Sequence, residues 1–196
     1  MRRDAPAVVP VNLPNLISLA RLLSVPVGIW LLVNGSYSYA FWLFVGAAIS
    51  DAVDGFIAKR FALSSELGAY LDPIADKALL VSVYVTIGLQ GHVAAWLVIL
   101  VVFRDVLIVG GWVLLQFLGQ PMKMQPNWSS KLNTAAQIAL AALVLAGLGL
   151  EFGVDGFVEV TVWVVAATTV WSGAQYVIQG FKWVNGAAGS TAGSES

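Results

Sequence analysis

One stretch of the sequence decides the fold and the chemistry: Asp51-Ala-Val-Asp54-Gly55-Phe-Ile-Ala58-Lys59-Arg60, then residues 61–67, then Gly68-Ala-Tyr-Leu-Asp72-Pro-Ile-Ala-Asp76. Residues three or four apart share one face of an α-helix. Each half therefore predicts a helix with two carboxylates and small residues along one stripe, and the segment between them can turn the chain back so that the stripes face each other. Converging carboxylates repel one another in a low dielectric unless protons or cations neutralise them. Their oxygens are the ligands that Mg²⁺, Mn²⁺ and Ca²⁺ prefer.

The composition places these aspartates in a membrane protein. Of 196 residues, 59% are hydrophobic and only 11% are charged, whereas about a quarter of the residues of a soluble domain are charged. Long apolar runs recur along the whole chain, which is typical of a polytopic membrane protein. The chain has no cysteine and one histidine, His92. Thiolate metal sites, disulfides and multi-histidine zinc sites are therefore excluded, and no basic run suggests a nucleic-acid partner.

The apolar runs predict an all-α integral membrane fold with six transmembrane helices. An N-terminal interfacial segment leads into the first helix, which ends near Val33, and the others are expected at 39–60, 67–90, 93–118, 129–150 and 156–183. Each is long enough to cross about 30 Å of hydrocarbon at ~1.5 Å per residue. We expect one domain over residues 1–184, and a disordered tail rich in Gly, Ala and Ser over 185–196.

The basic residues predict the topology. They are found near the N-terminus, after the second and fourth helices and near the tail, at Arg2, Arg3, Lys59, Arg60, Lys123, Lys131 and Lys182. The loops after the first, third and fifth helices carry no Lys or Arg. The positive-inside rule then places both termini and the carboxylate stripes on the cytoplasmic side. Because no signal or transit peptide is visible, we expect a multi-pass protein of the bacterial inner membrane.

The aspartate stretch also resembles a known family. Its pattern, D-x2-D-G-x2-A-[basic]-x8-G-x3-D-x3-D, looks like the signature of the CDP-alcohol phosphotransferases, which are integral membrane enzymes of phospholipid synthesis. The family usually has Arg directly after the Ala, whereas this chain has Lys59 followed by Arg60. A basic group is kept, but Lys acts as a point charge and not as a bidentate donor.

The resemblance implies a reaction and a site. The reaction is phosphoryl transfer from CDP-diacylglycerol to an alcohol at two divalent cations, Mg²⁺ or Mn²⁺, with release of CMP by a homodimeric enzyme. The implied metal ligands are Asp51, Asp54, Asp72 and Asp76, of which Asp76 is also the implied catalytic base. The implied contacts to the nucleotide and diphosphate are Gly55, Ala58, Lys59, Arg60 and Gly68.

Other segments bear on the acceptor alcohol. Three further segments look like the eukaryotic-type cardiolipin synthases of this family, which act on phosphatidylglycerol. They are residues 12–21, the Arg104-Asp105-Val106 step and residues 130–137. The related phosphatidylglycerophosphate synthases, which act on glycerol 3-phosphate, typically begin the fifth helix with Lys-x-Lys-Thr, and Asn133 stands here at the second Lys. Fewer cations suit the singly charged lipid, so we expect phosphatidylglycerol, with glycerol 3-phosphate as the alternative. The candidate acceptor residues are Arg21, Arg104, Lys131 and Asn133.

Each acceptor candidate also has a structural interpretation. Arg104 can form a neutral pair with Asp105, and Lys131 can anchor its helix at the cytoplasmic interface. Arg21 has the same ambiguity, and Asn133 can hydrogen-bond either the substrate or a neighbouring helix. A different class of protein, a cation or proton transporter, would also carry intramembrane aspartates. That hypothesis is disfavoured because all four aspartates of the stretch lie in one half of the expected membrane, and only Arg104-Asp105 continues a polar series toward the other face.

Overall fold

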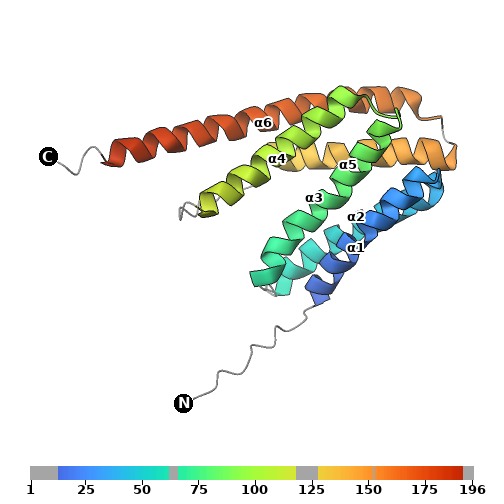
Figure 1. Cartoon of the computed structure of the whole chain (residues 1–196), viewed down its shortest axis with the longest axis horizontal. Coiled ribbons are helices and arrows are strands. Elements are labelled where there is room, and N and C mark those ends of the chain that lie inside the picture. Colours follow the sequence, from blue (N-terminus) through green and yellow to red (C-terminus); the bar gives the residue numbers. More distant parts are fainter. Residues whose placement is uncertain (1–12, 62–65, 118–127, 152, 192–196) are drawn as a thin grey trace, which may run out of the picture. The chain divides into compact units, whose positions relative to one another are not determined.

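A computed structural model describes residues 13–61, 66–117, 128–151 and 153–191, with side chains described for 19–50, 77–111, 128–151, 153–154 and 156–180. Every secondary-structure element in these ranges is an α-helix (Figure 1). The helices are α1 (Leu13–Val33), α2 (Tyr37–Phe61), α3 (Glu66–Leu89), α4 (Ala95–Phe117), α5 (Trp128–Leu150) and α6 (Asp155–Thr191). The predicted all-α fold with six helices is confirmed for the described part of the chain.

One helix end differs from the prediction. The sequence predicts that the last helix ends near Trp183 and that a disordered tail follows from residue 185, but α6 continues to Thr191. Adding residues to an existing helix avoids the cost of nucleation, and alanine has the best helix propensity, so the small residues after Trp183 extend α6. The remainder of the predicted tail, 192–196, lies outside the described residues, as does most of the predicted N-terminal interfacial segment.

Glycines end two of the helices where the sequence predicts turns. Gly35 after α1 and Gly91 after α3 have φ angles of 71° and 81°, the left-handed region that glycine adopts without strain. The Ser36 amide then donates to the Leu31 carbonyl at 2.9 Å, and the equivalent bond after Gly91 is also 2.9 Å. Both ends have the hydrogen bonds of a Schellman motif, which satisfies carbonyls that would otherwise lack a donor.

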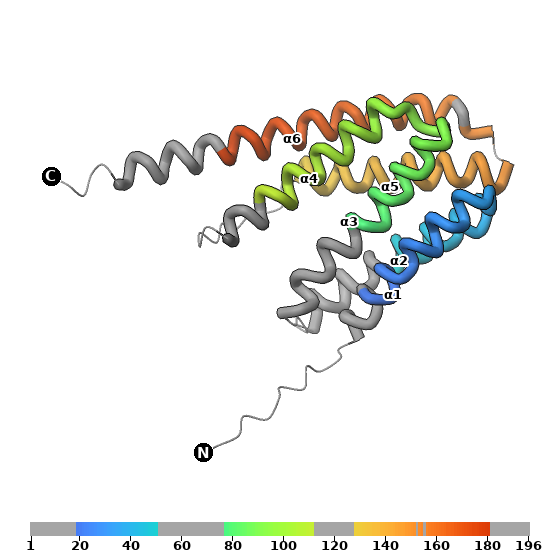
Figure 2. Tube along the Cα trace, in the orientation of Figure 1, coloured from blue at the N-terminus to red at the C-terminus, as the bar shows by residue number. Residues whose placement is uncertain are grey.

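The helices group into two compact units, Met1–Val83 and Tyr84–Ser196, and each is described by itself. In the first unit, α1 packs along α2 (Figure 2). The helices are in contact at Gly28, where an added Cβ would lie 3.5 Å from the Leu43 side chain, an ordinary van der Waals distance. The buried side chains of the two helices include Leu32, Ala40 and Phe44.

In the second unit, α6 packs along both α5 and α4. Its apolar core contains Leu97, Val101, Leu140, Leu145 and Val165, none of which is exposed. Large apolar side chains also cover much of the outer surface, among them Phe103, Phe157, Trp163 and Trp171. A soluble protein rarely exposes so many large apolar side chains, whereas a lipid environment accepts them.

Two helices in the described part of the chain are long and apolar enough to cross a membrane: Trp128–Leu150, and Gly156–Gly180 within α6. Shorter apolar stretches cover Leu19–Val33, Tyr37–Ser50 and Lys77–Leu89. The expected six membrane spans therefore remain a prediction, as does a single domain over residues 1–184.

Candidate active site

The aspartate stretch lies on two helices. Residues 51–60 belong to α2 and residues 68–76 belong to α3, so both halves are helical as predicted. The predicted metal, nucleotide and base residues lie outside the residues whose side chains are described: Asp51, Asp54, Gly55, Ala58, Lys59, Arg60, Gly68, Asp72 and Asp76. Among the side chains that are described, no three His, Cys, Asp or Glu residues are grouped as metal ligands. Carboxylates three apart on α2 and four apart on α3 share a helical face, and an all-oxygen donor set fits Mg²⁺ or Mn²⁺.

A pocket of about 330 Å³ lies between α1 and α2 in the first unit. Arg21 lines it and is 7% exposed, and the pocket is also bounded by Ser24, Trp42, Gly46 and Ser50. Ser50 directly precedes Asp51, so the pocket adjoins the start of the aspartate stretch along α2. The Ser24 and Ser50 hydroxyls donate to the Arg21 and Gly46 carbonyls of their own helices. The guanidinium is therefore the cationic group of the pocket, and a guanidinium suits an anionic headgroup.

Arg104 is buried in the second unit and makes several polar contacts. Its Nη1 donates to Asp105 Oδ1 at 2.8 Å, and its Nη2 donates to the Ser130 hydroxyl at 2.7 Å and to the Ser172 hydroxyl. The Tyr176 ring lies 5.8 Å from Cζ of the guanidinium. Arg104 therefore forms the neutral pair with Asp105 that the sequence offered as one alternative, and it links α4 to α5 and α6.

Asn133 is also buried between helices. It has no exposed surface, and its Oδ1 accepts a hydrogen bond of 2.8 Å from the Thr169 hydroxyl. The Thr168 hydroxyl lies 3.0 Å from the same Oδ1 but is closer, at 2.8 Å, to the Val164 carbonyl. Nearer the start of α5, the Ser129 hydroxyl donates to Gln175 Oε1 at 2.6 Å. Ser130 on α5 and Ser172 on α6 both contact Arg104. We call these contacts and those of Asn133 and Ser129 the α5–α6 polar seam.

Lys131 differs from the other acceptor candidates of the second unit because it is exposed. Its Nζ lies 5.5 Å from the centre of the Trp128 ring, which is itself 85% exposed. An ammonium over an indole face is a cation–π contact of modest strength at an exposed site. Lys131 therefore keeps an accessible charge near the start of α5.

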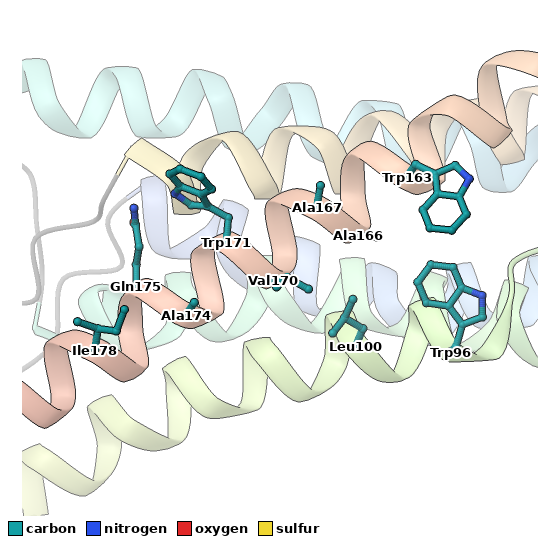
Figure 3. A pocket seen from close by; sticks show the side chains of 10 residues that line it. All are labelled: Trp96, Leu100, Trp163, Ala166, Ala167, Val170, Trp171, Ala174, Gln175 and Ile178. Atoms are coloured by element: carbon teal, nitrogen blue, oxygen red, sulfur yellow. The ribbon is translucent and has the colours of Figure 1, made fainter.

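The second unit also has an apolar groove of about 720 Å³ between α4 and α6. Figure 3 shows the rings of Trp96 and Trp163 at one end of it and Gln175 and Ile178 farther along α6. The two indole centres are 5.9 Å apart. A third indole, Trp171, also lines the groove, and apart from Gln175 the rest of the lining is aliphatic. The groove therefore suits hydrocarbon and not a nucleotide.

Sequence reasoning missed the hydroxyl and aromatic partners of the buried polar residues. Thr169, Ser172 and Tyr176 recur every three or four residues on α6, so they share one helical face. Polar residues repeated at that spacing in an apolar helix are a signal for a buried polar contact. The pattern was available in the sequence, but it does not say which helix supplies the partners.

The chain was compared with known proteins. The model of the CDP-alcohol phosphatidyltransferase family matches residues 11–171, which include the whole aspartate stretch. The chain therefore belongs to the CDP-alcohol phosphatidyltransferase family, whose members are membrane-associated transferases that generally use divalent metal ions. The resemblance of the aspartate stretch to this family is confirmed.

Individual relatives carry two different names. A chloroplastic CDP-diacylglycerol–glycerol-3-phosphate 3-phosphatidyltransferase of Oryza sativa is 37% identical over 188 residues, which is 86% of this chain and 56% of that protein. A cardiolipin synthase (CMP-forming)/mitochondrial hydrolase fusion protein of Schizosaccharomyces pombe is 32% identical, over 85% of this chain and 31% of that protein. A CDP-diacylglycerol–glycerol-3-phosphate 3-phosphatidyltransferase of Bacillus subtilis is 33% identical, over 84% and 93%.

The chain thus spans about half or less of the two eukaryotic relatives and nearly all of the Bacillus one. The names of the relatives divide between a lipid acceptor and a glycerol phosphate acceptor. The comparisons are consistent with the expected cardiolipin synthase and support its alternative equally.

Proposed function

We propose that this protein transfers the phosphatidyl group of CDP-diacylglycerol to the hydroxyl of phosphatidylglycerol, giving cardiolipin and CMP. The observation that carries the proposal is the complete aspartate signature inside a family match over residues 11–171. A transporter has no need of that signature, so the proposal favours an enzyme.

The roles follow from the chemistry of the side chains. Asp51, Asp54, Asp72 and Asp76 would hold two divalent cations, Mg²⁺ or Mn²⁺, which when bound supply neutralising charge for the diphosphate. The Asp76 carboxylate accepts the proton of the attacking hydroxyl. The small residues Gly55, Ala58 and Gly68 leave room for the nucleotide. The basic residues Lys59 and Arg60 attract the diphosphate.

The polar contacts of the second unit support a singly charged acceptor. Arg104 is neutralised by Asp105, and Asn133 contributes no charge. Lys131 then remains as the cationic acceptor candidate of the second unit. Phosphatidylglycerol carries one negative charge and glycerol 3-phosphate carries nearly two, so this charge balance favours the lipid.

Glycerol 3-phosphate is the second candidate acceptor. It is favoured by the names of the rice and Bacillus relatives, the second of which this chain matches over almost its entire length. Lys131 is exposed and could meet a doubly charged headgroup, so the alternative is tested beside the main proposal.

The proposal includes the membrane arrangement. All six helices cross the membrane, both termini and the aspartate stretch face the cytoplasm, and the protein is a homodimer in the inner membrane of a bacterium. The apolar outer surface, the distribution of Lys and Arg and the bacterial relative support this arrangement.

A paired assay tests the function. Purified protein in detergent receives Mg²⁺ or Mn²⁺, CDP-diacylglycerol and one acceptor, and CMP and lipid products are measured. Cardiolipin from phosphatidylglycerol supports the proposal, and product from glycerol 3-phosphate alone supports the second candidate. Asp76→Asn should abolish CMP release, whereas Glu159→Gln, at an exposed position on α6, should not. Metal-loaded protein that releases no CMP with any alcohol would contradict both candidates.

A further inference from the structure

The pocket between α1 and α2 lies within the first unit and combines a buried charge with open space. Of the residues that line it, Arg21 on α1 carries the charge. From α2 come Trp42, Gly46 and Ser50, which are spaced by four residues and therefore share one helical face. A Cβ added at Gly46 would meet no atom within 4 Å. The guanidinium is thus buried in the protein but borders a cavity that a ligand can occupy.

The pocket lies where the uncharged stretches of both helices meet charged residues. On α1 no charged residue follows Arg21 before the helix ends at Val33, and on α2 none precedes Asp51. The chain belongs to a membrane-associated family, and charged residues that border an apolar helical stretch are typical of the boundary between hydrocarbon and headgroups. This is the position that a site for a lipid headgroup requires.

Large apolar side chains surround the pocket on the outer surface of both helices. Leu19, Leu23 and Ile49 each directly precede a residue that lines the pocket, and Trp42 lines it itself. All four side chains are exposed. A small soluble anion gains nothing from this rim, whereas the acyl chains of a phospholipid would cover it and remove apolar surface from water. The rim therefore favours a lipid over a soluble phosphate.

The guanidinium specifies which group of the lipid it receives. It has five N–H donors in a planar fork, so Arg21 can keep a partner within the protein and still donate two parallel bonds to a phosphate. The Ser24 and Ser50 hydroxyls already donate to carbonyls of their own helices. One cation balances the single negative charge of a phosphodiester better than the nearly two charges of a phosphate monoester. The pocket is therefore complementary to a phosphodiester.

We propose that the pocket between α1 and α2 binds the phosphodiester group of an anionic phospholipid, which enters sideways from the bilayer. Arg21 binds the phosphate, and the exposed apolar side chains of both helices contact the acyl chains. The site lies in the same unit as the aspartate stretch, and Asp54 stands four residues after Ser50 on α2. Lipid binding here requires neither metal nor a particular acceptor, so the inference does not rest on the proposed function.

Displacement of a fluorescent phosphatidylglycerol from the full-length protein in detergent tests the proposal. Neither metal nor CDP-diacylglycerol is added, so the measurement does not depend on turnover. The competitors are phosphatidylglycerol, glycerophosphoglycerol, which is its phosphodiester without acyl chains, and diacylglycerol, which has the chains without the phosphate. At a fixed amount of detergent, phosphatidylglycerol should displace the probe at a concentration about tenfold or more below that of either part, since each part lacks one set of contacts.

Two substitutions assign the binding to this pocket. Arg21→Gln should weaken phosphatidylglycerol about tenfold and leave diacylglycerol unchanged, because the charge-assisted bonds to the phosphate are lost. Gly46→Leu fills the cavity from a position where the added Cβ has room, and it should weaken phosphatidylglycerol by a similar factor. Gly46→Leu keeps the proposal testable even where Arg21→Gln fails to fold. Gly180→Leu, at an exposed position on α6, is the matched control and should bind as the wild type does.

Each outcome supports or overturns one part of the proposal. Equal displacement by diacylglycerol overturns the recognition of phosphate, and equal displacement by glycerophosphoglycerol overturns the lipid as the ligand. A folded Arg21→Gln or Gly46→Leu variant that binds phosphatidylglycerol as tightly as the wild type overturns the pocket as the site. Failure of the proposed function has a different signature, because CMP release is then absent from the paired assay while lipid binding is intact.

Discussion

The guanidinium of Arg104 donates to the carboxylate of its sequence neighbour Asp105, with 2.8 Å between Nη1 and Oδ1, and both side chains are about 4% exposed. Adjacent residues on a helix do not normally face each other, so the long arginine side chain bends toward a neighbour on its own helix. The pair adds no net charge to α4. The same guanidinium also contacts Ser130 and Ser172, so it connects three helices without an unbalanced charge in the apolar interior.

Because of this pair, we expect the effects of single and double substitutions on the free energy of unfolding to be clearly non-additive. Arg104→Met leaves a buried carboxylate without its cation, and Asp105→Leu leaves a buried cation without its carboxylate. Each should lower the free energy of unfolding by about 3–5 kcal/mol, the usual cost of breaking a buried ion pair. The double variant should be clearly more stable than the sum of the two predicts. Denaturant unfolding in detergent measures all four proteins, and additive effects would contradict the coupling.

A second prediction concerns the contact between α3 and α4. A Cβ atom at Gly88 would lie 2.6 Å from Cγ2 of Val98, closer than real carbon contacts come. Gly88→Ala should therefore lower the free energy of unfolding by about 1–3 kcal/mol, as overpacking does. Val98→Ala removes the clashing methyl groups and should recover most of the loss. Gly110→Ala on α4 is the control, because its Cβ would meet no atom within 4 Å, and it should be neutral or slightly stabilising.

The helices could be predicted from the sequence because their signals are local. The apolar runs give their lengths, and Gly35 and Gly91 mark two of the turns. Asn133 illustrates what the sequence could not supply. Its polarity and its position on α5 are evident from the sequence, but its pairing with Thr169 on α6 depends on how two distant segments pack. The extension of α6 past Trp183 was missed because composition alone does not show that an existing helix continues into a small-residue segment.

The candidate site, too, could be predicted from the sequence only where the signal is local. Four aspartates at helical spacing predict shared faces, because that inference needs only the helix period. The neutralisation of Arg104 could be offered from the sequence only as one of two alternatives, since a charge within an apolar run can face a neighbour or a substrate. The partners Ser130, Ser172 and Tyr176 lie on other helices, so no local rule identifies them.

A third prediction concerns the pocket at Arg21. If this guanidinium contacts the phosphate of a lipid headgroup, Arg21→Gln should raise the KM for that lipid about tenfold. A change of this size corresponds to the loss of one charge-assisted hydrogen bond. Arg21→Lys should keep part of the affinity. The measurement is CMP release in mixed micelles while the mole fraction of each lipid is varied separately.

Gly46 offers an independent way to test the same pocket. It lines the pocket, and a Cβ there would meet no atom within 4 Å, so Gly46→Leu fills the space without displacing the helix. The KM should rise as it does for Arg21→Gln. Gly180→Leu, an exposed position on α6, is the control and should change neither the KM nor the unfolding temperature. If Arg21→Gln lowers only the unfolding temperature and leaves every KM unchanged, the role of Arg21 is structural.

The last prediction concerns Lys131, which is exposed near the start of α5 and lies 5.5 Å from the Trp128 ring. Lys131→Gln should change the free energy of unfolding by less than about 1 kcal/mol, since an exposed cation–π contact is weak. If the ammonium attracts the acceptor phosphate, the same change should raise the KM for the acceptor severalfold and leave the KM for CDP-diacylglycerol unchanged. The effect should shrink as salt is added, because exposed charges are screened. Lys131→Arg keeps the charge, so its acceptor KM should remain near that of the wild type. Trp128→Leu removes the indole ring and measures its contribution separately. An unchanged acceptor KM in Lys131→Gln at low salt would leave Lys131 only its role as an interfacial anchor.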